Sequence, residues 1–182
     1  EALVGEILPM AQAAKNHGGI VIAQVEEVVD SIENPKDVRV PGILVDYLVI
    51  SDKQHHEQTF AESFNPDYAT HRDHAPSLKA LPFSERKIIG RRALQEIAKG
   101  DVVNLGIGLP ETVAVVAGEE KRLDDFTLTL ESGPIGGIPA SGLSFGCSAN
   151  PEAIIDQPSQ FDFYDGGGLD IAVLGAVEID EG

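Results

Sequence analysis

The sequence predicts an α/β fold with mainly parallel sheets and flanking helices, arranged as two related halves. Continuous apolar runs at residues 20–25 and 42–50 are typical of parallel strands that are covered on both faces. Farther along the chain, apolar runs alternate with helical patterns, as in proteins that build a parallel sheet. A polar stretch separates the two sets of elements. We therefore expect two units, residues 1–52 and 83–182, joined by a connector at residues 53–82.

The first unit is predicted to contain one helix and two strands. Residues 9–17 place apolar side chains on one face of a helix, and the glycine pair at 18–19 would end it. The apolar runs at 20–25 and 42–50 then form two buried strands, with prolines between them. The predicted order is helix, strand, turn, strand.

The connector is polar, contains three prolines and holds four of the five histidines. We interpret it as a long solvated loop because it has no sustained hydrophobic period. A metal site is the alternative. Its candidate ligands would be His55, His56, His71 and His74. Their spacing fits no recognised ligand pattern, so we expect no metal.

The second unit opens with a helix that Ser84 caps and that runs to Lys99, before Gly100. Its basic side chains form a cluster in an otherwise acidic chain. The cluster consists of Arg86, Lys87, Arg91 and Arg92. We expect a solvated helix face, and the alternative is contact with an anionic ligand or a neighbouring subunit.

Strands and helices alternate through the rest of this unit. Residues 102–105 and 126–130 are apolar runs that predict strands, and the helical segment at 110–119 lies between them. A short helix is expected near 151–155. The apolar run at 171–177 predicts the last strand.

Composition excludes several classes of protein. A chain of 182 residues with a formal charge of −17 is repelled by phosphate backbones, so we expect no nucleic-acid partner. No apolar run is long enough to span a membrane, and no cationic leader precedes an apolar core. The single cysteine cannot form an internal disulfide, which favours a reducing, cytoplasmic location. Because the chain starts without methionine and ends on a turn-like pair, we expect both ends to be cut from a longer protein.

Glu131 follows a predicted strand and precedes an unusual density of glycine. The glycines of the next fifteen residues are Gly133, Gly136, Gly137, Gly142 and Gly146. A carboxylate at a strand end among glycines is typical of the chemical sites of α/β sheets.

Glu131 could be a surface carboxylate, a general acid/base or a nucleophile. A general acid would need a second carboxylate, for which Asp125, Asp165 and Asp170 are candidates. The rival nucleophile Cys147 has no histidine within forty residues, and we expect a buried thiol.

A glycine turn precedes this region at Gly106 and Gly108. The segment LGIGLP matches half of a dinucleotide fingerprint, but it has no third glycine and no acidic partner at the expected distance. Its backbone N–H groups could instead face an anion or a developing oxyanion. Asn104 could add a side-chain amide, or could simply form the turn.

Three motifs at these positions strongly resemble one enzyme family. They are VNLGIGLP, LESGPIGG and YDGGGLDIAVLGA, and they resemble the acyl-CoA transferases of the acetate, propionate and 3-oxoacid type. AAKNHGGIVIAQVEEVV upstream looks like the end of the first domain of that family. The resemblance implies that 1–52 ends the first domain, 53–82 is the inter-domain connector, and 83–182 begins the second domain, with both domains incomplete.

The resemblance also implies roles for individual residues. Glu131 matches the nucleophile of the family, and Asn104 matches the asparagine that lies beside it. The expected oxyanion and pocket residues include four glycines, Gly106, Gly108, Gly133 and Gly136. The expected substrate- and CoA-binding residues are Gly166, Gly167, Gly168 and Asp170. Because segments that the family has on either side are missing, we expect the isolated chain to fold poorly or to be inactive.

The implied reaction moves CoA from an acyl-CoA to a small carboxylate without a metal or redox cofactor, coenzyme A being a substrate. It proceeds by a ping-pong mechanism through a glutamyl-CoA thioester, in a homo-oligomeric protein that needs no membrane. One alternative is an acyl-CoA hydrolase on the same scaffold, in which water resolves the thioester. The other is a non-catalytic α/β module that binds phosphate or another anion.

Overall fold

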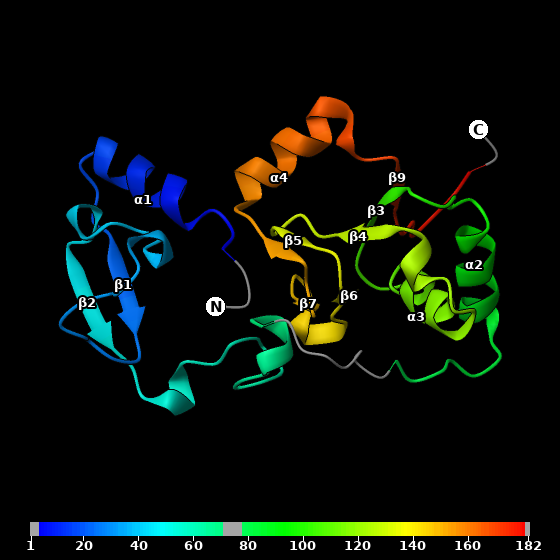
Figure 1. Cartoon of the computed structure of the whole chain (residues 1–182), viewed down its shortest axis with the longest axis horizontal. Coiled ribbons are helices and arrows are strands. Elements are labelled where there is room, and N and C mark those ends of the chain that lie inside the picture. The colour runs from blue at the N-terminus through cyan, green and yellow to red at the C-terminus, as the bar shows by residue number, and fades with distance from the viewer. Residues whose placement is uncertain (1–3, 71–77, 181–182) are drawn as a thin grey trace.

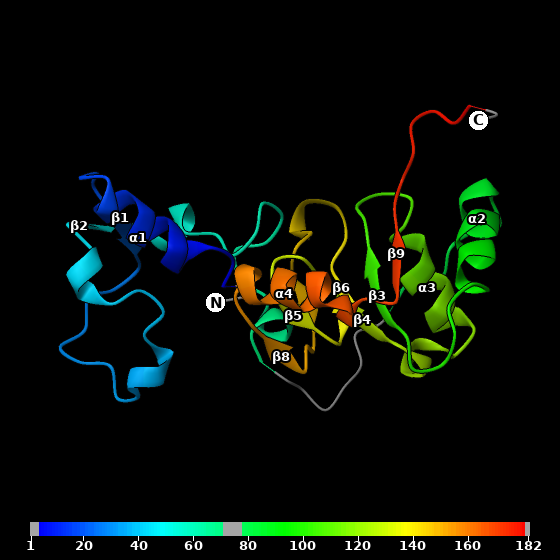
Figure 2. The same cartoon turned by 90° about the horizontal axis from the view of Figure 1, so that it is seen from above.

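The computed structural model describes residues 4–70 and 78–180, and Figure 1 shows two separate groups of elements. Helix α1 (Ile7–Asn16) lies beside the parallel strands β1 (Ile22–Val25) and β2 (Tyr47–Ile50). In Figures 1 and 2 this group lies at one end of the molecule and helices α2 and α3 lie at the other. The described chain contains no helix that is long and apolar enough to cross a membrane.

An ion pair connects α1 to the strands. Lys15 Nζ lies 2.6 Å from Asp46 Oδ1, and the Val21 backbone N–H donates to Asp46 Oδ2 at 2.8 Å. The hydrogen bond from Lys15 holds the pKa of Asp46 below its ordinary value. The prediction of strands buried on both faces is wrong for both strands, since the four residues of β2 are all exposed and β1 alternates exposed with half-buried residues. The reason is that, among the described residues, only two strands pair in this sheet.

The second sheet has five strands in the order β8-β5-β4-β3-β9. Its parallel part consists of β3 (Val102–Leu105), β4 (Thr127–Thr129) and β9 (Ile171–Val173). The short strands β5 (Pro134–Ile135) and β8 (Ala153–Ile154) add two antiparallel pairings. A separate hairpin pairs β6 (Ile138–Pro139) with β7 (Ser148–Ala149). The predicted α/β class with a mainly parallel sheet is confirmed.

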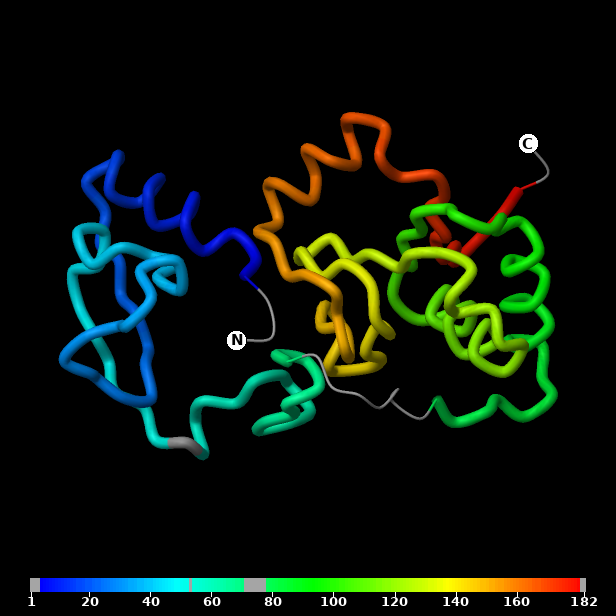
Figure 3. Tube along the Cα trace, viewed as in Figure 1, coloured from blue at the N-terminus to red at the C-terminus, as the bar shows by residue number. Residues whose placement is uncertain are grey.

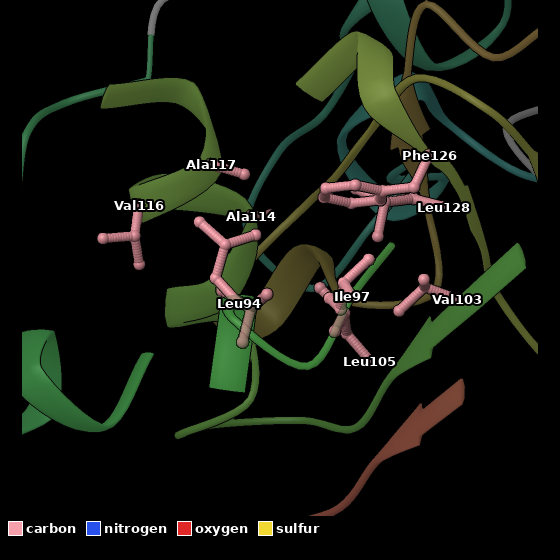
Figure 4. Close-up of a cluster of buried hydrophobic side chains, with 10 residues drawn as sticks. Leu94, Ile97, Val103, Leu105, Ala114, Val116, Ala117, Phe126 and Leu128 are labelled. Atoms are coloured by element: carbon pink, nitrogen blue, oxygen red, sulfur yellow. The ribbon is translucent and has the colours of Figure 1, made fainter. Parts of the chain in front are cut away.

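Helices cover both faces of this sheet. Alternate residues of β3 and β4 pack with α2 (Glu85–Leu94) and α3 (Thr112–Glu119) in one apolar core, which Figure 4 shows. The core contains Leu94, Ile97, Val103, Leu105, Val113, Ala114, Val116, Ala117, Phe126 and Leu128. Successive side chains of a strand point to opposite faces. Asn104 and Thr129 therefore point to the other face, where α4 (Gln157–Phe163) lies.

The connections give the sheet two distinct edges. We call the edge where β3, β4 and β9 begin the amino edge, and the edge where they end the carboxyl edge. Strand β8 runs parallel to β4, since both pair antiparallel with β5. Helix α4 connects β8 to β9 and therefore starts at the carboxyl edge and ends at the amino edge.

The sequence located most elements of this unit, with three corrections, and one of them is that β9 covers only the first three residues of the strand expected at 171–177. Ser84 caps α2 as predicted, its hydroxyl accepting from the Lys87 N–H. The helix ends at Leu94 rather than 99, where the Arg122 guanidinium donates to the carbonyls of Leu94 and Ile97. The predicted helix at 151–155 is wrong. Those residues include β8, and the helix begins only after Asp156, whose side chain accepts from the Ser159 N–H.

The described part of the connector is ordered against the second unit rather than solvated along its whole length. Figure 3 traces it from β2 to the β6–β7 hairpin. Thr59 Oγ1 lies 2.9 Å from Ser144 Oγ, and the Asn150 N–H donates to the Asp67 carbonyl at 2.8 Å. Tyr68 is buried with Cys147 and packs into a small apolar cluster. The boundaries of the three segments remain predictions.

Most of the basic cluster on α2 is engaged within the protein. Lys87 Nζ lies 2.5 Å from Glu119 Oε2, and Arg91 Nε lies 3.0 Å from Glu120 Oε1, at the end of α3. Arg92 pairs with Glu96 on the following turn. These contacts support a structural role for the cluster and leave few of its charges for an anionic ligand.

Glu119→Gln is expected to lower the thermal midpoint (Tm) at neutral pH. The hydrogen bond from Lys87 lowers the pKa of Glu119, so its contribution is complete above the pKa of the unfolded chain. It is lost as the pH falls through the lower pKa of the folded state. The Tm difference between parent and variant should therefore shrink below about pH 4. A difference that is constant with pH, or equal to that of the exposed control Glu178→Gln, would contradict this expectation.

Candidate active site

Glu131 lies on a tight hairpin between β4 and β5, at the carboxyl edge of the sheet. The Leu130 N–H donates to the Pro134 carbonyl and the Gly133 N–H to the Leu130 carbonyl, both at 3.0 Å. This pattern, with Gly133 at φ +119°, is that of a type I turn followed by a glycine bulge. Glu131 and Ser132 are the two central residues of the turn. The hairpin therefore projects Glu131 from the sheet, and its side chain is exposed.

Gly133 is required by two independent constraints. Its positive φ is unfavourable for residues with a side chain. In addition, a Cβ atom at this position would lie 1.9 Å from the carbonyl oxygen of Ile155, whose N–H donates back to the Gly133 carbonyl at 3.1 Å. The glycine after Glu131 thus allows the hairpin to lie directly against the start of α4.

The Glu131 carboxylate has no hydrogen bond or ion pair with any other described residue. The neighbouring Ser132 hydroxyl donates to the Gly146 carbonyl at 2.5 Å and fixes the turn from the side of the glycine loop. Because its charge is not neutralised locally, the carboxylate is free to attack an electrophile or to contact a cation of another molecule.

The three candidate second carboxylates do not lie at this edge. Asp125 precedes β4 and accepts from Arg122 Nε at 3.2 Å, and Asp170 precedes β9. Asp165 lies in the turn after α4. All three are therefore near the amino edge, and the pairing of carboxylates that a general acid needs is not supported by these residues.

Asn104 is buried next to the strand that carries Glu131. It pairs in register with Thr129, and its Nδ2 donates to the Thr129 carbonyl at 3.3 Å. One N–H of the amide remains for a further partner, since the group has two donors. Glu131 follows Thr129 by two residues, in the hairpin after β4, so Asn104 lies in register with a residue two positions before Glu131.

The four pocket glycines use their N–H groups within the protein. The Gly106 N–H donates to the Val173 carbonyl at 2.9 Å and the Gly108 N–H to Glu111 Oε1 at 3.0 Å. The Gly133 N–H closes the turn described above. The Gly136 N–H donates to the Leu128 carbonyl at 2.7 Å. In this conformation Gly106, Gly108 and Gly133 shape the carboxyl edge, Gly136 lies beside Leu128 after β5, and none of the four presents a free oxyanion donor.

The structure places the CoA-binding candidates at the opposite edge. Gly166, Gly167 and Gly168 form the turn after α4, and Gly168 lies against Phe163, where a Cβ atom would approach the ring to 2.0 Å. The Asp170 N–H donates to the Val102 carbonyl at 3.0 Å, and the Asp170 carboxylate accepts from the Val102 N–H at 2.8 Å. These residues therefore extend the β3–β9 pairing at the amino edge and are not brought together with Glu131.

Three residues on the α4 side of the sheet were not predicted from the sequence, namely Thr129, Gln160 and Tyr164. The Tyr164 hydroxyl donates to Thr129 Oγ1 at 2.8 Å. Gln160, one helical turn earlier, is fully buried, and neither polar atom of its side chain has a hydrogen-bond partner among the described residues. The only signal in the sequence is the spacing of Gln160 and Tyr164, which places them on one face of a helix.

Two candidates for a site remain, the histidines of the connector and a hollow beside α1. Within residues 4–70 and 78–180 no group of histidine, cysteine or acidic side chains could hold a metal ion. His55 and His56 lie at a short 3-10 turn, and His71 and His74 fall outside the described residues. A mostly apolar hollow of about 1010 Å³ lies between α1, β1 and Ile154, and none of the predicted site residues lines it.

Cys147 is buried, and burial raises the pKa of its thiol. We expect native protein to resist iodoacetamide at about pH 8 and unfolded protein to react, because the thiolate is the reactive form. Mass spectrometry of the labelled peptide provides the measurement. Rapid labelling of the folded protein would restore Cys147 as a rival nucleophile.

Known proteins similar to this chain are enzymes that transfer CoA. No protein-family model matches the chain. A caffeate CoA-transferase from Acetobacterium woodii is 48% identical over 184 residues, which cover 100% of this chain and 35% of that protein. The acetate CoA-transferase YdiF from Escherichia coli O157:H7 is 43% identical over 187 residues, covering 100% and 34%. This chain thus spans about a third of the length of the curated relatives it matches.

Solved structures resemble the fold described above. The crystal structure of the apoenzyme of acyl-CoA transferase YdiF from Escherichia coli O157:H7 superimposes with a TM-score of 0.78. The two chains are 42% identical, and the match covers 94% of this chain and 32% of that one. A structure of the same enzyme as a thioester complex with CoA matches equally well, with a TM-score of 0.78 and 41% identity.

Proposed function

We propose a function for this chain from the premise that it is related, over its whole length, to the acyl-CoA transferases. The protein transfers CoA from a short-chain acyl-CoA to a carboxylate acceptor such as acetate, and Glu131 is the covalent nucleophile. One observation carries the proposal: a glycine-bulge hairpin projects Glu131 from the carboxyl edge, and its carboxylate has no partner among the described residues.

The first half of the reaction would move CoA onto the protein. A Glu131 carboxylate oxygen attacks the thioester carbonyl, the carbon–sulfur bond breaks, and CoA leaves as a thiolate, with a mixed anhydride of Glu131 and the acyl group as the product. The thiolate then attacks the glutamyl carbonyl of the anhydride. The acyl group leaves as a carboxylate, and a glutamyl-CoA thioester remains.

The second half would repeat these steps in reverse with the acceptor. Its carboxylate attacks the glutamyl thioester, the CoA thiolate leaves, and the thiolate returns to the acyl carbon of the new anhydride. Glu131 is released as a carboxylate. Charge and atoms balance without oxidation, so the proposal uses coenzyme A only as a substrate and no metal or redox cofactor.

Each tetrahedral intermediate needs a donor for its oxyanion. The remaining N–H of the Asn104 amide is the best-placed candidate among the predicted residues, because Asn104 lies in register with Thr129. The backbone N–H of Ser132, beside Glu131, also makes no hydrogen bond to a described residue. The glycine N–H groups would contribute only after exchanging their present partners.

The covalent intermediate can be trapped. This chain and the longest natural polypeptide that contains it are incubated with acetyl-CoA, treated with hydroxylamine, digested and analysed by peptide mass. We expect a hydroxamate confined to Glu131, because hydroxylamine attacks a glutamyl thioester. A modification at another residue, or none in the folded longer polypeptide, would overturn the nucleophile assignment.

Two other functions differ in what they release. An acyl-CoA hydrolase on the same scaffold produces free CoA without an acceptor, whereas the transferase produces a new acyl-CoA only when a carboxylate is added. A non-catalytic anion-binding module forms no adduct and keeps its ligand when Glu131 becomes Gln. The Glu131 carboxylate, which is unpaired among the described residues, favours the two covalent reactions over anion binding, and the similarity to CoA-transferases favours the transferase over the hydrolase.

The setting of the protein is also part of the proposal. The buried free thiol of Cys147 is compatible with a reducing, cytoplasmic location. A homo-oligomer is expected from the resemblance alone. Measurement of the mass of the natural polypeptide in solution by light scattering would test it, and a monomer would contradict it.

A further inference from the structure

Three hydrogen bonds converge on Thr129, two residues before Glu131. The Tyr164 hydroxyl donates to Thr129 Oγ1 at 2.8 Å, and Thr129 Oγ1 donates its own proton to the Val103 carbonyl at 3.3 Å. Asn104 Nδ2 donates to the Thr129 carbonyl at 3.3 Å. Thr129 is only 2% exposed, so these bonds are shielded from water. Together they connect β3, β4 and α4 at one point.

Each of the three hydrogen bonds restrains an element next to Glu131. The two bonds between β3 and β4 supplement their backbone pairing and fix Asn104 beside Thr129. The bond from Tyr164 connects the same point to the C-terminal end of α4, and the N-terminal end of that helix lies against Gly133 of the hairpin. Tyr164 itself lies near two aromatic rings. Phe161 lies edge-on with the ring centres 5.8 Å apart, and Phe163 lies at 6.2 Å.

We propose that Tyr164 and Thr129 are positioning residues that hold the Glu131 carboxylate and the Asn104 amide in one fixed geometry. The inference rests on the proposed function, because it assigns these residues to the same reaction. The Glu131 carboxyl group takes part in all four steps, once as nucleophile, twice as the group attacked and once as leaving group, so its position relative to the oxyanion donor must be kept throughout. A shift of about 1 Å in such a geometry lowers the rate by about a hundredfold.

Tyr164→Phe in the natural polypeptide is expected to lower kcat about tenfold, while the KM for acyl-CoA changes by less than about twofold. The Tyr164 hydroxyl contacts no substrate in this proposal, so the affinity for acyl-CoA in the ground state should not change. The rate of adduct formation at Glu131 should fall by the same factor as kcat. Thr129→Val should reproduce the defect, and Thr129→Ser, which keeps the hydroxyl, should retain most of the activity.

Tyr68→Phe is the matched control. The Tyr68 hydroxyl likewise donates to a side-chain oxygen, Glu62 Oε1 at 3.0 Å, but its ring is buried, whereas that of Tyr164 is half-buried, and it lies in the cluster around Cys147. It should shift Tm to a similar extent without changing kcat. The proposal is overturned if Tyr164→Phe keeps kcat within about twofold of the parent, or if Tyr68→Phe lowers kcat equally.

Two further outcomes are decisive. If Tyr164→Phe fails to fold, Thr129→Val and Thr129→Ser decide, and equal activities of these two variants would overturn the proposal. The trapping experiment on the parent separates this inference from the proposed function. If the parent protein forms the Glu131 adduct and Tyr164→Phe keeps its kcat, only the positioning role is overturned. If the parent protein forms no adduct, the proposed function itself is overturned.

Discussion

Glu131→Gln is expected to lower kcat for CoA transfer by at least about a thousandfold. An amide is neutral and cannot attack the thioester as a carboxylate does. Glutamine has the same length, and the Glu131 side chain makes no hydrogen bond or ion pair with the described residues, so the hairpin should stay intact. The measurement is steady-state transfer from acetyl-CoA to a carboxylate acceptor, together with the hydroxamate mass and Tm.

Glu152→Gln is the matched control for this prediction. Glu152 is another exposed glutamate, in the segment that leads into β8, and its carboxylate has no hydrogen bond or ion pair within the described part of the chain. It should leave kcat within about twofold of the parent. If Glu131→Gln retained more than about a tenth of the activity, the covalent mechanism through Glu131 would be wrong, and another group would have to supply the nucleophile.

The sequence was informative where local chemistry decides the structure. The β-branched residues before Asn104 predicted β3 with its observed bounds, and the hydroxyl of Ser84 caps α2 as expected. The turn between β4 and β5 follows from Gly133, which suits the bulge position. The resemblance to acyl-CoA transferases, inferred from three short motifs, is confirmed by relatives that align with the whole chain.

Features that depend on distant parts of the chain could not be predicted. A glycine-rich motif does not reveal which N–H groups are already bonded, and the Gly108 N–H is engaged by Glu111. The direction of α4 places Asp170 at the amino edge, although in sequence it looked comparable to the residues near Glu131. The contact of Tyr164 with Thr129 joins residues that are 35 positions apart, and no local pattern marks it.

Gly133→Ala is expected to be strongly destabilising, by about 3 to 5 kcal/mol in the free energy of unfolding. Two costs add. The backbone at φ +119° is strained for alanine, and the new methyl group would lie 1.9 Å from the Ile155 carbonyl oxygen, which is backbone and cannot rotate away. Any surviving fold must move the hairpin, so transfer activity and the Glu131 adduct should be lost together. Urea unfolding and the trapping experiment measure the two effects.

Two other glycines separate these costs. Gly100 has φ +95°, and no atom lies within 4 Å of the place that a methyl group would take, so Gly100→Ala should show only the backbone strain, about 1 to 2 kcal/mol. Gly166 has open space and no positive φ, so Gly166→Ala should be nearly neutral. The excess of Gly133→Ala over Gly100→Ala then measures how tightly the hairpin is pressed against the start of α4. An excess near zero would mean that Ile155 moves aside, and the hairpin could not then be the rigid support that a four-step reaction at the Glu131 carboxyl group requires.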